Sequence, residues 1–266
     1  MTETTKQPST ETAESHILLE TEQPKSVPTL GKSLAWLFVF AVLFYGAAVV
    51  YGMVYGGYLG STQPDLIADE ELFESTILDA MLSPSGIATT SLLQALLIIP
   101  VLLWASHFAH QPWRETLAFR AVPLRMLGFW VLVYCGYFVA QSLLELVAPS
   151  DLGDIMTPLA GSKHLGLAFA LIVLAPLIEE LIFRGYLFTA WRHTKLGLWG
   201  TVILTSLIFT SIHAAQYSGL LLLYLFIFSV ILGLAREKTG SIWAPIALHV
   251  LNNSIAVFTL VYLGLH

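Results

Sequence analysis

The sequence predicts an all-α membrane protein, a polytopic bundle of about seven to eight transmembrane helices. Hydrophobic residues make up 56% of the 266 residues, and only 11% are charged. A typical soluble domain carries about 25% charged residues. The few charges gather between apolar segments, and most of these segments reach the roughly 20 residues that a helix needs to cross a hydrocarbon core of about 30 Å.

Three regions are expected along the chain. Residues 1–31 are rich in Thr, Glu, Gln, Ser and Pro without apolar periodicity, which predicts a disordered cytoplasmic tail. Residues 32–164 should hold the N-terminal transmembrane helices, separated by an acidic loop at 59–86. Within that loop, residues 65–82 could instead form an amphipathic surface helix. Residues 165–264 should form the remaining helices and, from the groups described below, the functional core.

Seven spans are expected in chain order, at residues 33–58, 87–108, 124–147, 165–190, 196–213, 219–235 and 242–263. Pro176 lies inside the long fourth span, and a proline removes a backbone donor and kinks a helix. If the helix breaks there, the count becomes eight.

Basic residues alternate with these spans. They precede the first span and follow the second, fourth and sixth, at Lys25, Lys32, Arg114, Arg120, Arg125, Arg192, Lys195, Arg236 and Lys238. By the positive-inside rule the N-terminus is expected in the cytoplasm. The net charge of −6 comes largely from the tail and the acidic loop, so no nucleic-acid partner is expected. The single cysteine, Cys135, excludes an internal disulfide.

Few ionisable groups are expected at membrane depth, where each is disfavoured by about 2.5–3.5 kcal/mol unless it pairs, lines a wet cavity or takes part in chemistry. Glu180 and Arg184 are four residues apart and should pair on one helical face. Glu179 is rotated by about 100° from its neighbour and is left as a free carboxylate. The alternative is that Glu179, Glu180 and Arg184 together form a structural ion pair that joins helices.

Two later spans supply further polar groups. His213 follows Phe209 by four residues, and Asn253 follows His249 by four, so each pair shares a helical face. Two hydrolytic chemistries fit a meeting of these groups with Glu179. In one, the carboxylate, with His213, activates a water while His249 and Asn253 stabilise an oxyanion. In the other, Glu179, His213 and His249 bind Zn²⁺ and leave a position open for water.

The three motifs, Glu-Glu-x-x-x-Arg at 179–184, Phe-x-x-x-His at 209–213 and His-x-x-x-Asn at 249–253, resemble those of the CPBP family. This family holds the CAAX proteases and bacteriocin-processing enzymes and is also called the Abi domain. The resemblance covers residues 165–264 and implies an intramembrane endopeptidase similar to the type II CAAX prenyl endopeptidases.

The resemblance also implies roles for individual residues. Glu179 and His213 would be the water-activating pair, and His249 and Asn253 the oxyanion site, with Glu180, Arg184 and Phe209 as support. It leaves open whether zinc is a cofactor. The expected partners are the lipid bilayer, in a bacterial cell membrane, and a peptide or membrane-anchored protein substrate. A non-catalytic self-immunity or scaffold protein of the same fold is the main alternative, and a small transporter a further one.

Overall fold

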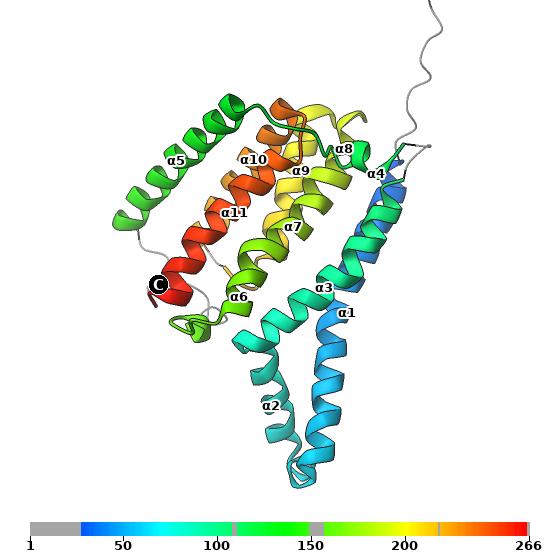
Figure 1. Cartoon of the computed structure of the whole chain (residues 1–266), viewed down its shortest axis with the longest axis vertical. Helices are drawn as coiled ribbons and strands as arrows, with labels where there is room; N and C mark the ends of the chain where they lie inside the picture. Colours follow the sequence, from blue (N-terminus) through cyan, green and yellow to red (C-terminus); the bar gives the residue numbers. More distant parts are fainter. Residues whose placement is uncertain (1–27, 108–110, 149–156, 218, 265–266) are drawn as a thin grey trace, which may run out of the picture.

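The computed structural model describes residues 28–107, 111–148, 157–217 and 219–264, and these residues form a bundle of helices without a strand (Figure 1). Six helical segments in them are long and apolar enough to cross a membrane, which confirms the all-α polytopic fold. The predicted tail falls largely outside the described residues. Only its last residues are seen, and they begin the first helix, α1 (Leu30–Thr62).

The acidic region between α1 and the next span is helical, so of the two alternatives for this region the helix expected at 65–82 corresponds to the structure and an irregular loop does not. A 3₁₀ turn (Pro64–Ala68) leads into α2 (Glu70–Leu82), and Asp69 caps this helix by accepting a hydrogen bond from the Leu72 amide at 3.0 Å. Acidic residues in its first turn favour a helix because they complement the positive end of the helix dipole. Figure 1 shows α2 beside the lower half of α1, where the two project away from the bundle.

The next two spans lie close to their predicted positions. Helix α3 (Pro84–Ala105) packs along α1, and α5 (Leu124–Val147) has the bounds expected from the sequence. A four-residue helix, α4 (Trp113–Thr116), lies between them in the chain. In Figure 1 α5 lies on the far side of the bundle from α1.

The fourth span is one helical segment from Leu165 to Arg192, so Pro176 does not divide it and the eight-span alternative was wrong. Three α-helical parts, α6 (Leu165–Phe169), α7 (Ala175–Glu180) and α8 (Phe188–Arg192), alternate with π-helical turns at Ala170–Leu174 and Leu181–Leu187. A proline ring clashes with the carbonyl four residues earlier in a regular α-helix. The wider π turn directly before α7 explains how the segment continues through the proline.

Three helices pack around this segment. Helix α9 (Gly197–Ile212) has 16 residues, which is about 24 Å of helix and less than the other spans. Helix α10 (Gly219–Thr239) lies against α9, α11 and α5, and α11 (Trp243–Val257) continues into a π turn at Phe258–Tyr262. All seven expected spans therefore correspond to helices, and six of them have spanning length.

Candidate active site

The predicted ion pair between Glu180 and Arg184 forms in the middle of the fourth span. Arg184 Nη1 donates to Glu180 Oε1 at 2.9 Å, and both side chains are fully buried. Arg184 Nη2 also donates to the backbone oxygen of Ser229 on α10 at 2.9 Å and to its Oγ at 2.6 Å. The pair thus joins two helices. The role of Ser229 was missed because a single serine in an apolar helix forms no recognisable motif.

His249 joins the same carboxylate from α11. Its Nδ1 lies 2.8 Å from Glu180 Oε1, and the residue is only 4% exposed. Its other ring nitrogen, Nε2, lies 3.7 Å from Glu179 Oε2, which is too long for a direct hydrogen bond. Glu180 therefore fixes one edge of the imidazole ring and turns the other edge toward Glu179.

Glu179 differs from its neighbour in burial and in partners. Its side chain is 18% exposed, whereas that of Glu180 is fully buried. Its shortest ionic contact among the described residues is the 3.7 Å approach of His249. Since Glu180 carries the contacts to Arg184 and His249, Glu179 is the carboxylate left within reach of a water or a substrate.

The Phe209 ring lies between the two histidines. Its centroid is 4.7 Å from that of His213 and 5.9 Å from that of His249, and the Arg184 guanidinium lies 4.9 Å from the same ring. His213 caps the end of α9, with Nδ1 2.7 Å from the Phe209 backbone oxygen. His213 thus lies next to Arg184 and His249 because all three pack on the Phe209 ring. Among the hydrogen bonds between described residues, none joins His213 to Glu180.

Asn253 lies one turn after His249, but its amide already has partners. Nδ2 donates to the backbone oxygen of Leu171 at 2.8 Å, and Oδ1 accepts from Asn252 at 3.2 Å. Leu171 belongs to the first π turn of the fourth span, so this bond holds α11 against that span. An amide nitrogen carries two N–H groups, so an oxyanion would have to be bound by the second one.

Tyr217 lies after α9 and was not found by sequence reasoning, since no motif includes it. Its ring stacks on His213, with centroids 6.3 Å apart and planes 16° apart. Burial, and then the negative charge of Glu179, raise the pKa of the Tyr217 hydroxyl. The phenol beside His213 therefore keeps its proton to a higher pH than an exposed tyrosine does.

The donor types that were expected for zinc are present but are not arranged as a ligand set. Both histidines have Nδ1 at a hydrogen-bonded oxygen, the arrangement typical of metal-binding histidines. In the described part of the chain, however, no three His, Cys, Asp or Glu residues are grouped so that they could hold a metal ion. The arrangement of Glu179, His213 and His249 therefore does not fit a zinc site.

Comparison with known proteins gives one family and one relative. Residues 161–255 match the model of a family described as type II CAAX prenyl endopeptidase Rce1-like, and this range contains all three motifs. An uncharacterized 24.3 kDa protein of Escherichia coli is 30% identical over 129 residues, which are 47% of this chain and 58% of that protein. No solved structure matches.

Proposed function

We propose, from the match of residues 161–255 to the type II CAAX prenyl endopeptidase Rce1-like family, that the protein is an intramembrane endopeptidase that uses activated water. One observation carries the proposal: Glu179 stays partly accessible, while the adjacent Glu180 is fully buried and bound to Arg184 and His249. A structural ion pair would not need the second carboxylate, which is costly at this depth.

In this mechanism Glu179 acts as the general base. It takes a proton from a water whose oxygen attacks the carbonyl carbon of the scissile peptide bond. The tetrahedral oxyanion collapses, the C–N bond breaks, and the proton passes from Glu179 to the leaving nitrogen. His213, at the end of α9, would orient the water or share its proton.

His249 has the geometry to stabilise the oxyanion. Glu180 accepts from its Nδ1, and a donor to the oxyanion at Nε2 is present when the ring is doubly protonated. Glu179, Glu180, Arg184 and protonated His249 then have charges that sum to zero. Once Glu179 accepts the proton from water, the cluster has one net positive charge to oppose the oxyanion. The second amide N–H of Asn253 would add a further donor.

We further propose that the substrate is a peptide or a membrane-anchored protein, cleaved in a bacterial cell membrane. CAAX-type removal of C-terminal residues and processing of bacteriocin-like peptides are the two activities that the family allows. His213 and Tyr217 lie at the end of α9 opposite Lys195. With the N-terminus in the cytoplasm, this end of the site faces the outer side of the membrane.

The decisive experiment replaces Glu179 by Gln in the purified protein and measures cleavage of a membrane-tethered peptide library. Loss of a general base should lower the rate by about 10²- to 10⁴-fold. Glu74→Gln, on the exposed surface of α2, removes the same charge far from the motifs and should leave the rate unchanged. Cleavage by Glu179→Gln at the wild-type rate would refute the water-activation role.

Zinc dependence is tested separately, because Glu179, His213 and His249 would have to move together to bind a metal. Elemental analysis of the active protein, with and without a zinc chelator, supplies the answer. Full activity without bound zinc supports the metal-free mechanism. Stoichiometric zinc whose removal abolishes cleavage contradicts it.

A non-catalytic scaffold or self-immunity protein is the second candidate. It is favoured by the contacts that the motif residues make across helices, from Arg184 to Ser229 and from Asn253 to Leu171. On this reading the motifs hold the bundle together, no peptide is cleaved, and Glu179→Gln leaves the biological activity intact.

A further inference from the structure

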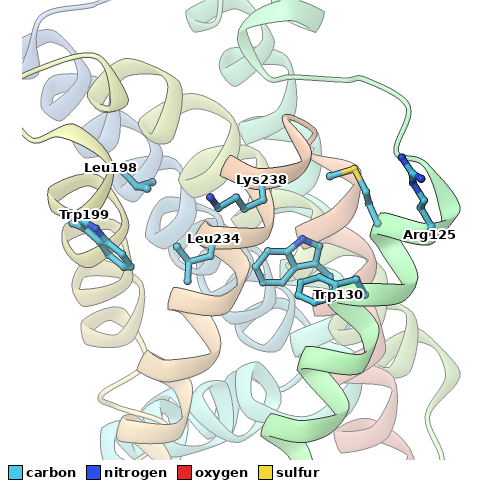
Figure 2. A pocket seen from close by; sticks show the side chains of 8 residues that line it. Arg125, Trp130, Leu198, Trp199, Leu234 and Lys238 are labelled. Carbon is cyan, nitrogen blue, oxygen red and sulfur yellow. The ribbon is translucent and has the colours of Figure 1, made fainter.

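A groove opens on the side of the bundle where α5 and α9 begin and α10 ends (Figure 2). Its volume is about 730 Å³, within the range of about 300–1,000 Å³ found for small-molecule sites. None of the motif residues contributes to it. It is lined by Arg125, Met126, Phe129, Trp130, Leu198, Trp199, Leu234 and Lys238.

The walls of the groove are apolar and only partly covered by the protein. Trp130 is buried at 7% exposure, but Phe129 is 59% and Trp199 62% exposed. In a membrane-spanning bundle such exposed apolar side chains face the acyl chains of the bilayer. Tryptophan is also enriched where a membrane protein crosses the level of the lipid head groups.

Two cations lie at the rim of this apolar surface. Figure 2 shows the ends of Arg125 and Lys238 on the two sides of Trp130. Both side chains are exposed, and neither takes part in an ion pair formed between described residues. The nearest carboxylate in sequence, that of Glu237, is bound to Arg192 at 2.6 and 2.9 Å. The rim thus carries positive charge without a described counter-ion.

We propose that this groove is a binding site for an anionic phospholipid. The phosphate lies between Arg125 and Lys238, and an acyl chain lies against Trp130, Trp199 and Leu234. The ligand must be apolar along most of its length and anionic at one end, which is the chemistry of such a lipid. The start of α5 and the end of α10 carry the two cations, and the positive-inside pattern places these ends at the cytoplasmic leaflet, where anionic head groups attract Lys and Arg.

The test compares lipid retention by the purified full chain. Protein in nanodiscs of phosphatidylglycerol and phosphatidylcholine with the same acyl chains is transferred to detergent, and bound lipid is counted by native mass spectrometry. Wild-type protein should keep phosphatidylglycerol in preference to phosphatidylcholine. Arg125→Gln combined with Lys238→Gln should weaken that preference by about tenfold.

A matched control removes two other exposed cations from the same predicted side, with Lys32→Gln and Arg114→Gln, and should keep the wild-type preference. Trp199→Ala should reduce retention of both lipids, because it removes apolar contact surface from the groove and leaves the charge unchanged. Equal retention of the two lipids by wild-type protein would overturn the proposal. So would an equal loss of preference in both double variants, since surface charge alone would then explain it.

Discussion

Glu180 and His249, which are 69 residues apart in the chain, are joined by a contact of 2.8 Å between Oε1 and Nδ1. The same oxygen accepts from Arg184, so one fully buried carboxylate links the fourth span to α11 and, through Arg184, to α10. Its neighbour Glu179 makes no such hydrogen bond and only approaches His249 Nε2, at 3.7 Å. The proposed mechanism therefore gives these two adjacent glutamates separate roles, Glu180 in positioning and Glu179 in chemistry.

This division of roles predicts that substitution of Glu180 lowers stability, whereas substitution of Glu179 lowers activity. Glu180→Gln leaves Arg184 buried without its counter-charge, and breaking a buried pair in this way costs about 3–5 kcal/mol of stability. Glu179→Gln should leave the thermal unfolding of the detergent-solubilised protein close to wild type while it lowers the cleavage rate by about 10²- to 10⁴-fold. Unfolding temperatures of the two variants, measured side by side, check the prediction. Equal destabilisation would show that the two carboxylates are not divided in this way.

The sequence predicted much of this arrangement, for identifiable reasons. The Glu180–Arg184 pair follows from helical spacing, and the number of span-like helices follows from apolar length. The hydrogen bond from His249 to Glu180 does not follow from either, because it depends on how α11 rotates against the fourth span. The engagement of Asn253 by a backbone oxygen was also unpredictable, since it depends on the π turn that contains Leu171.

Ser229→Ala tests the contact that sequence reasoning missed. The Ser229 hydroxyl is 2.6 Å from Arg184 Nη2, and a hydrogen bond to a charged group contributes about 1.5–3 kcal/mol. We expect a loss of stability in this range, with reduced but measurable cleavage because Glu179 is untouched. Ser211→Ala is the matched control, since its exposed hydroxyl bonds only to carbonyls of its own helix. Indistinguishable unfolding of the two variants would contradict a supporting role for Ser229.

The membrane side of the site can be found by cysteine labelling. In a Cys135→Ser background, single cysteines replace Ala215, beside His213, and His193, beyond the end of α8; both positions are exposed. A maleimide that cannot cross membranes should label Ala215→Cys in intact cells and His193→Cys only after permeabilisation. The reverse pattern would place the end of the site near His213 in the cytoplasm and would contradict the positive-inside orientation.

Tyr217 predicts how stability depends on alkaline pH. Burial and the Glu179 charge raise the pKa of its hydroxyl in the folded protein, so above about pH 10 the unfolded chain releases this proton first. The contribution of this group to stability is therefore fully present below that pH and is lost as the pH rises through the folded pKa. When the pH rises from about 9 to 11, the unfolding free energy of Tyr217→Phe should therefore fall less than that of wild type. The other tyrosines are the same in both proteins, so their contributions cancel in the comparison.

Parallel curves for wild type and Tyr217→Phe would show that the hydroxyl is not held in its neutral form by its surroundings. Because the charge of Glu179 is one cause of the raised pKa, Glu179→Gln should narrow the difference between the tyrosine and phenylalanine forms. Unfolding of the double variant Glu179→Gln/Tyr217→Phe therefore tests whether the Glu179 carboxylate lies beside the stacked His213 and Tyr217 rings. This test needs no substrate.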